Sequence, residues 1–328
     1  MRKFFILCFA LLLMTGCSSS GKQTPTANQQ SEQAIVPQFD SDSAFLYVKT
    51  QCDFGARVPN SKAHDACAAY LKAKMEHFGA KVIAQKADLK GYDGTILKAT
   101  NIIASYRPEL KDRILLCSHW DCRPWCDQDK DLANHHKPVM GANDGASGVG
   151  VLIEVARQLQ KQQPALGVDI IFLDAEDYGT PEFYQGPRDE DSWCLGTQYW
   201  AKNPHAPGYH ARFGILLDMV GAPDAVFYHE QESLNFAPSV VEKVWNKARD
   251  YGFTAYFINA PGGAITDDHI YINRLTGIPC IDIIHFDPHS ETGFGSYWHT
   301  IHDTMDNVSK QTLLAVGQTM LGVVYGER

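Results

Sequence analysis

Carboxylate and imidazole side chains follow several short apolar runs of this 328-residue sequence. Three runs lead directly into such groups: 114–117 into Ser118-His119-Trp120-Asp121, 168–173 into Asp174-Ala175-Glu176-Asp177, and 213–217 into Asp218. Asp144 and His299 stand in two further polar segments. If these groups converge, they repel and desolvate one another unless a cation or protons intervene. Mixed oxygen and imidazole ligands suit zinc, and three protein ligands leave a fourth position open for a substrate.

Each of these residues alone has an ordinary structural explanation. An aspartate that follows a strand often caps the next helix, which would account for Asp144. His299 could be a surface histidine, and Asp218 could close a loop. Because their joint placement after apolar runs is harder to explain in this way, we favour a shared functional site.

The apolar runs alternate with segments of helical spacing. Residues 63–78 have this spacing and end before Gly79, with four residues near one face: Ala66, Ala69, Tyr70 and Met75. Residues 148–159 predict another helix and residues 278–284 another strand. Strands that alternate with helices predict a single α/β domain with a mostly parallel, twisted sheet flanked by helices on both faces. Such sheets place their sites at the carboxyl ends of the strands, where the polar groups stand.

The first 38 residues differ in composition from the rest. Arg2 and Lys3 precede the apolar run Phe4–Met14, and Thr15-Gly16-Cys17 follows it. This is the order of a secretory signal peptide, and its final cysteine makes it resemble a bacterial lipoprotein signal. We expect a signal peptide over residues 1–16, lipidation of Cys17, a flexible tether over residues 17–38, and a catalytic domain over residues 39–328. The alternative is a plain signal peptide cleaved near Cys17.

A lipid on Cys17 would anchor the protein to a membrane of the cell envelope. Ser18 favours the outer membrane, facing the periplasm, if the host is Gram-negative. The sequence has 29 Lys and Arg against 38 Asp and Glu, so its formal net charge is −9 and we expect no nucleic-acid partner. Cys122 and Cys126 are near enough for a local disulfide, which the sequence alone does not establish.

From about Phe54 to Val323 the sequence resembles the zinc-dependent aminopeptidase clan. Five motifs carry the resemblance: Phe54-Gly55-Ala56-Arg57-Val58-Pro59, His119-Trp120-Asp121, Asn143-Asp144-Gly145-Ala146-Ser147-Gly148, Glu176-Asp177 and His299-Thr300. Within the clan the sequence resembles the type II, or animal-like, glutaminyl cyclases. Three segments carry this narrower resemblance: Leu217-Asp218-Met219-Val220-Gly221-Ala222-Pro223, Asp267-Asp268-His269-Ile270 and Trp298-His299-Thr300.

The resemblance implies one zinc ion with three ligands, Asp144, Asp177 and His299. The second ligand is usually glutamate in the cyclases. Asp177 is one methylene shorter, so the metal or the loop must move to compensate. The disulfide of the animal enzymes also has no matching cysteine pair, because Val149 occupies the second position.

The resemblance further implies a general acid/base at Glu176, with two buried acids, Asp218 and Asp267, beside it. Trp298 and Phe294 match residues that line the substrate pocket. A pocket tryptophan expected soon after the glutamate pair has no clear match in the longer, acidic loop of residues 178–193. Either Phe183 or Trp193 could replace it.

The activity that the resemblance implies is that of a glutaminyl-peptide cyclotransferase. It would convert the N-terminal glutamine of a peptide or protein into pyroglutamate and release ammonia, with zinc as a Lewis acid. The amine attacks an amide of its own residue, so proximity is largely built in. Asp267, which engages Asp218 in the cyclases, favours this activity because it removes a ligand from a second metal ion.

The first alternative is a zinc-dependent aminopeptidase with two metal ions. All five clan ligands are present: His119, Asp144, Asp177, Asp218 and His299. The second alternative is an envelope lipoprotein that binds peptides through an inactive enzyme fold. The presence of Glu176 and of every ligand speaks against it.

Overall fold

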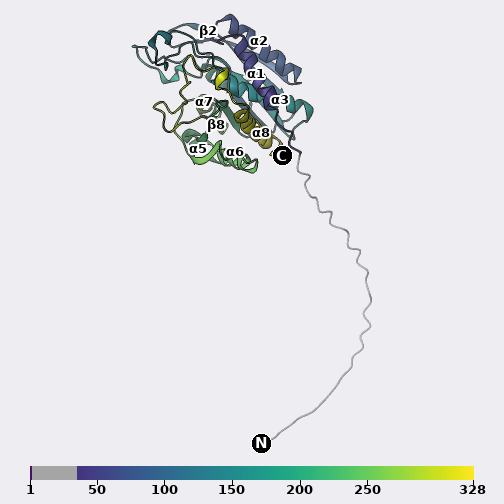
Figure 1. Ribbon diagram of the computed structural model, residues 1–328. Helices are drawn as coiled ribbons and strands as arrows, with labels where there is room; N and C mark the ends of the chain where they lie inside the picture. Colours follow the sequence, from purple (N-terminus) through teal and green to yellow (C-terminus); the bar gives the residue numbers. More distant parts are fainter. Residues whose placement is uncertain (2–34) are drawn as a thin grey trace. The chain divides into compact units, whose positions relative to one another are not determined.

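A six-stranded sheet in the order β1-β2-β4-β3-β5-β8 forms the centre of the fold (Figure 1). The structure is a computed structural model that describes Met1 and residues 35–328. The predicted lipidation site Cys17, the signal peptide after Met1 and most of the tether lie outside the described residues. The strands are β1 Lys81–Lys90, β2 Ile96–Tyr106, β3 Arg113–His119, β4 Gly167–Leu173, β5 Gly214–Asp218 and β8 Cys280–Ile284.

The sheet is mixed, with its parallel part at the predicted strands. β4 pairs in parallel with β3, β3 with β5, and β5 with β8. β1 and β2 form a long antiparallel hairpin, and β2 pairs antiparallel with β4. The sequence analysis did not predict this hairpin. In β1 exposed residues alternate with half-buried ones, so the strand lacks a strong apolar pattern.

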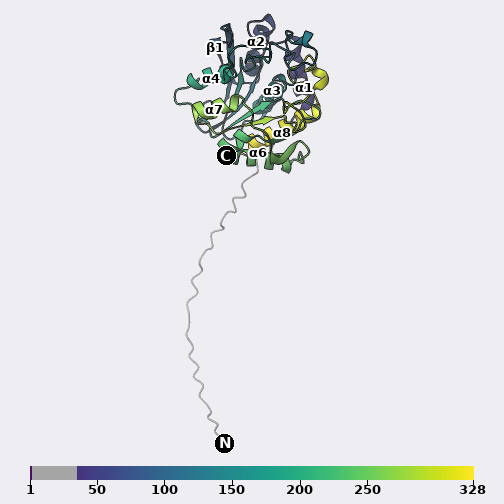
Figure 2. The ribbon, with the colours of Figure 1, turned by 90° about the vertical axis from the view of Figure 1, so that its left-hand side faces the viewer.

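Helices cover both faces of the sheet, which confirms the predicted α/β class. In β3, Ile114 and Leu116 belong to the core of one face, and Leu115 and Cys117 to that of the other, as alternation along a strand requires. Figure 2 shows the helices of the two faces on opposite sides. On the first face lie α1 Ser41–Asp53, α2 Lys62–His77, α3 Ala146–Lys161 and α8 Lys310–Gly326, and on the second α4 Leu195–Lys202 and α7 Asp268–Thr276.

A smaller unit of secondary structure packs beyond β8. It contains the two parallel strands β6 Phe227–His229 and β7 Phe257–Pro261, with the helices α5 Gln231–Phe236 and α6 Pro238–Asp250. Short 3₁₀ turns are η1 Leu132–Asn134, η2 Glu190–Ser192 and η3 Met305–Asn307. Among the described helices, none has the length and apolar character needed to span a bilayer.

The buried face of helix α2 overlaps only in part with the one that the sequence spacing predicted, since Met75 is shared. Its buried residues are His64, Cys67, Leu71 and Met75. Ala66 and Ala69 are exposed. The face is set by a polar contact, since His64 Nε2 lies 2.9 Å from both carboxylate oxygens of the buried Asp174.

All seven cysteines within the described residues are free thiols. This includes Cys122 and Cys126, so no local disulfide joins them.

The carboxyl ends of β3, β4 and β5 meet at one edge of the sheet. β3 ends at His119, β5 ends at Asp218, and the segment Asp174–Asp177 follows β4 directly. Because these strands are parallel neighbours, the polar residues that follow them converge, as the sequence predicted.

Candidate active site

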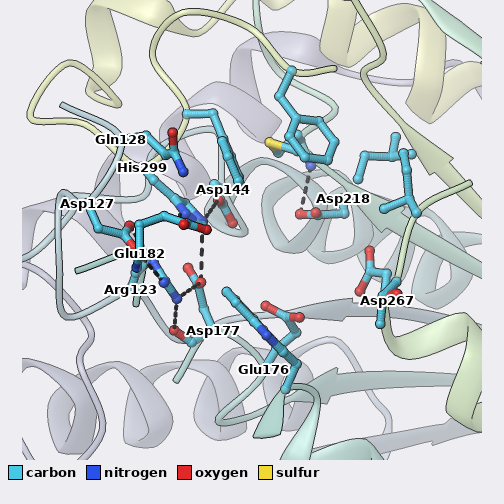
Figure 3. Close-up of a pocket in the computed structure, with 17 residues that line it drawn as sticks. Arg123, Asp127, Gln128, Asp144, Glu176, Asp177, Glu182, Asp218, Asp267 and His299 are labelled. Atoms are coloured by element: carbon cyan, nitrogen blue, oxygen red, sulfur yellow. Dashed lines mark hydrogen bonds and ion pairs between the residues drawn. The ribbon is translucent and has the colours of Figure 1, made fainter. Parts of the chain in front are cut away.

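A pocket at this edge of the sheet is lined by the predicted catalytic, metal-binding and substrate-binding residues (Figure 3). It holds about 650 Å³ of empty space, including its open mouth. The predicted residues in its lining are Asp144, Glu176, Asp177, Asp218, Asp267, Phe294, Trp298 and His299. Residues that are distant in sequence therefore form one cavity.

Asp144, Asp177 and His299 form a triad with the spacing of a metal site. Each offers one ligand atom, and these atoms lie within 4.8 Å of one another. His299 Nε2 is 3.5 Å from Asp144 Oδ2 and 3.4 Å from Asp177 Oδ1. Both distances exceed those of a charge-assisted hydrogen bond, about 2.7–2.9 Å. Tetrahedral zinc with bonds of about 2.0–2.1 Å separates its ligand atoms by about 3.3–3.4 Å, so this donor set fits zinc.

The ordinary explanations for these residues do not hold in the structure. Asp144 does not cap α3, because Gly145 is the N-cap residue and no side chain caps that helix. His299 is 3% exposed and is not a surface histidine. Burial disfavours its charge, but the carboxylate of Asp177 together with those of Asp127 and Asp144 outweighs this and raises the pKa of His299 to about 10. The triad is thus a buried, strongly interacting group.

Two further aspartates hold the loops that carry the triad. The Asp303 carboxylate accepts hydrogen bonds from two consecutive backbone N–H groups, those of residue 143 at 2.7 Å and of Asp144 at 3.0 Å. Asp121 accepts from the N–H groups of Glu176 at 3.1 Å and Asp177 at 3.2 Å. The sequence analysis gave neither aspartate a role, although Asp121 stands inside a quoted motif.

A buried ion pair, missed by the sequence analysis, lies behind the same triad. Arg123 is 1% exposed and donates from Nε to Asp127 Oδ1 at 2.8 Å and from Nη2 to Asp127 Oδ2 at 2.6 Å. Its Nη1 donates to the Asp177 carbonyl at 3.2 Å and lies 3.4 Å from Asp177 Oδ1. Asp127 Oδ1 is 3.5 Å from His299 Nδ1. Burial opposes the charge of Asp127, but Arg123 and His299 outweigh it and hold the pKa of that carboxyl well below its usual range.

His119 lies in a second triad with shorter contacts. Its Nε2 is 2.9 Å from Asp144 Oδ1 and 3.1 Å from Asp218 Oδ1, which are hydrogen-bond distances. Gly145 permits this approach, since a Cβ at residue 145 would come within 2.4 Å of His119 Nε2. His119 is therefore in direct contact with both acids and hydrogen-bonded to Asp218.

Glu176 and Asp267 are buried acids in the wall of the pocket. Burial raises the pKa of both groups well above their usual values. The neighbouring carboxyls of Asp218 and Asp268 add to the shift at Asp267. Figure 3 shows Glu176 between Asp177 and Asp267, with Asp218 on the side of Asp267. A carboxyl group with a raised pKa at such a position can both accept and return a proton.

Aromatic rings form the remaining wall. The rings of Trp298 and His299 stack with centroids 3.8 Å apart, and Phe294 lies 4.7 Å from Trp298. Trp193 also lines the pocket, with its ring nearly parallel to His299 at 6.3 Å. Phe183 is not part of the lining. The sequence left Phe183 and Trp193 open as replacements for the expected pocket tryptophan, and Trp193 is the one that lines the pocket.

Comparison with known proteins places these features in a family. The sequence model of peptidase family M28 matches residues 101–324. Glutaminyl-peptide cyclotransferase from Bos taurus is 27% identical over 249 residues, which cover 65% of this chain and 62% of the bovine protein. The match thus spans less than two thirds of that relative.

Two solved structures are more similar. Bacteroides thetaiotaomicron glutaminyl cyclase bound to N-acetylhistamine is 62% identical with a TM-score of 0.88, and the match covers 90% of this chain and 100% of that one. A Zn-dependent exopeptidase from Parabacteroides distasonis is 57% identical with a TM-score of 0.88, over 89% of this chain and 100% of that one. The similar proteins therefore include both a cyclase and a peptidase by description.

Proposed function

This chain belongs to peptidase family M28, and we propose that it is a zinc-dependent glutaminyl cyclase that converts N-terminal glutamine of peptides or proteins into pyroglutamate and ammonia. The observation that carries the proposal is the difference between the two triads. At His299 the contacts of 3.4 and 3.5 Å leave room for an ion between the ligand atoms. At His119 the contacts are shorter: Nε2 lies 2.9 Å from Asp144 Oδ1 and is hydrogen-bonded to Asp218 Oδ1 at 3.1 Å. This favours one metal ion over two.

In the proposed site, Asp144, Asp177 and His299 would hold the zinc ion. Bound there, zinc supplies a Lewis acid that polarises the γ-carbonyl of the substrate glutamine. Glu176, next in sequence to Asp177, would accept a proton from the attacking α-amine and return it to the departing ammonia.

The other groups of the pocket would position the substrate. Asp267, with Asp218 beside it, would hold the leaving nitrogen. Trp298, Phe294 and Trp193 would pack around the glutamine side chain and keep water away from it. Exclusion of water suits a cyclisation, since the nucleophile is the substrate's own amine.

A two-metal aminopeptidase is the second candidate, and one observation favours it. His119, Asp144 and Asp218 also have ligand atoms within 4.8 Å of one another. A metal ion in this second triad would require His119 to give up its hydrogen bond to Asp218 and its close contact with Asp144. Asp144 belongs to both triads, so in such an enzyme it would serve both ions, which two-metal hydrolases hold about 3.5–4 Å apart.

We extend the proposal to the location of the enzyme. Residues 39–328 would form the catalytic domain, joined by the tether to a lipid on Cys17 in the cell envelope, at the outer membrane if the host is Gram-negative. The tether would leave the pocket free to accept the N-termini of other proteins or peptides.

A direct test compares the two reactions on the same protein. A dipeptide that begins with glutamine should yield ammonia and a pyroglutamyl product, while leucine-initiated aminopeptidase substrates should stay intact. The purified enzyme should hold one zinc equivalent, and His119→Ala should retain it. Release of free amino acids, with two zinc ions of which His119→Ala loses one, would replace the cyclase by the peptidase.

A further inference from the structure

A thiol group faces the proposed general base. Cys194 directly precedes α4, is fully buried, and its Sγ lies 3.2 Å from Glu176 Oε1. Glu176, Cys194 and Asp267 each offer a ligand atom, and these atoms lie within 4.8 Å of one another. The proposed cyclisation uses the two carboxyl groups but leaves the thiol without a role.

Asp267 brings a carboxylate oxygen without a partner to this cluster. The residue is 3% exposed, its Oδ1 accepts from the Asp268 backbone N–H at 2.5 Å, and its Oδ2 has no hydrogen-bond donor among the described residues. Glu176 and Asp267 both line the pocket, so a cation that enters the pocket can reach them. The cluster can therefore be approached from the pocket through its two carboxyl groups, and it holds an acceptor oxygen without a partner among the described residues.

The chemistry of the three groups suits a soft divalent cation. Thiolate ligands select zinc and softer ions over magnesium or calcium. With zinc–sulfur bonds of about 2.3 Å and zinc–oxygen bonds of about 2.0–2.2 Å, a tetrahedral ion separates its sulfur and oxygen ligands by about 3.5 Å. The observed 3.2 Å between Cys194 Sγ and Glu176 Oε1 needs only a small adjustment to reach that spacing.

We propose that Glu176, Cys194 and Asp267 form an inhibitory metal site that binds cadmium or excess zinc. Binding replaces the thiol proton and the protons that the two buried carboxyl groups carry, all of which pass to solvent, and joins the cation to the sulfur and to the two carboxylates. Glu176 then no longer accepts a proton from substrate. The inhibition rests on the role proposed for Glu176, whereas the binding of the cation does not.

This site is separate from the two histidine triads. It contains neither His119 nor His299, and its distinguishing ligand is sulfur. A metal bound here is therefore recognised by a sulfur-to-metal charge-transfer band in the ultraviolet, which oxygen and imidazole ligands do not produce. The band also reports on the site in a protein that shows no activity.

The test is a cadmium titration of the purified protein loaded with one zinc equivalent. The charge-transfer band should appear together with one additional metal equivalent, and glutamine cyclisation should decline in parallel. Cys194→Ser keeps a hydroxyl that can donate to Glu176, and its inhibition is measured relative to its own activity without cadmium. It should lack the band and require at least about tenfold more cadmium for half inhibition, because even the loss of an outer partner commonly lowers metal affinity by 10–100-fold.

Cys52→Ser is the matched control, since Cys52 is a half-buried thiol in α1 outside the pocket. It should leave the band and the inhibition unchanged. Cys194→Ala, measured in the same way, replaces the serine variant if that protein does not fold.

Inhibition of Cys194→Ser at wild-type cadmium concentrations, or persistence of the band in it, would overturn the proposal and place the cation elsewhere. If the wild type shows the band but never releases ammonia from glutamine peptides, the metal site stands and the proposed cyclase function fails. If ammonia is released but no band appears, the cyclase function stands and the proposed metal site fails.

Discussion

Removal of the Arg123 guanidinium tests the buried network that supports the proposed metal ligands. In Arg123→Met, the Asp127 carboxylate stays buried but loses the two guanidinium donors at 2.8 and 2.6 Å and keeps the backbone N–H of Glu182 as a hydrogen-bond donor. Loss of one partner of a buried ion pair commonly costs about 3–5 kcal/mol, because the other charge remains without compensation. We expect the free energy of unfolding to fall by about that amount.

The same substitution should weaken zinc binding. Arg123 donates to the carbonyl of Asp177, and Asp127 stands 3.5 Å from Nδ1 of His299, so the pair supports two of the three proposed ligands. Outer partners of metal ligands are commonly worth about 10–100-fold in metal affinity. The dissociation constant of zinc should therefore rise by a factor in that range.

Urea unfolding of the metal-free protein and competition with a zinc chelator measure the two effects separately. Arg188→Met is the matched control, because Arg188 pairs with Glu182 at 3.0 Å while both side chains are about half exposed. Exposed pairs contribute about 0–1 kcal/mol, so this variant should stay close to the wild type in both measurements. Equal losses in the two variants would refute the reasoning. Asp127→Asn added to Arg123→Met should recover part of the lost stability, because it removes the uncompensated charge.

Three further predictions address chemistry, pH dependence and anchoring. Glu176→Gln should lower kcat by about 10²–10⁴-fold, since an amide cannot accept the proton, and should keep the zinc content and KM near wild type. Loss of zinc by this variant, with retention of zinc by Asp177→Ala, would show that the roles of proton carrier and zinc ligand are exchanged. Burial favours the neutral form of Glu230, but hydrogen bonds from an imidazole and backbone amides outweigh it and lower its pKa to about 2. The contribution of ionised Glu230 to the free energy of unfolding should thus be complete above its usual pKa of 4.5 and disappear as the pH falls toward 2. Measured by urea unfolding, the free energy of unfolding should fall more steeply over this pH interval in the wild type than in Glu230→Gln. Parallel pH dependence in the two proteins would contradict the lowered pKa of Glu230. Cys17→Ser should release the protein from membrane fractions or block its processing, and unchanged lipid labelling would exclude lipidation at that residue.

The sequence predicted the parts of the fold whose signals are local. Apolar runs that end in polar residues identified β3, β4 and β5, and the rule for parallel sheets then placed Glu176 and Asp218 at one edge. The hairpin of β1 and β2 was missed because β1 is half exposed and has little apolar contrast. Its position is fixed by pairing with β2 rather than by its own pattern.

Buried polar pairs account for most of what the sequence could not show. His64 is buried on the core side of α2, where it contacts the carboxylate of Asp174, 110 positions later, and stacks on Trp120. Arg123 and Asp127 resemble a surface pair at i, i+4 spacing until the fold encloses them. Such contacts join residues whose burial depends on the complete tertiary structure, so periodicity along the chain carries no trace of them.

Asp177, the residue that departs most clearly from the cyclase pattern, shows how these hidden pairs affect the site. Its side chain is one methylene shorter than the usual glutamate, yet its Oδ1 lies 3.4 Å from His299 Nε2, a spacing that fits zinc ligands. The backbone is held on both sides, since Asp121 accepts from the Asp177 N–H and Arg123 donates to the Asp177 carbonyl. Asp127 holds Arg123 in turn. Asp121, Arg123 and Asp127 therefore hold the loop where the shorter side chain of Asp177 already has a spacing that fits zinc.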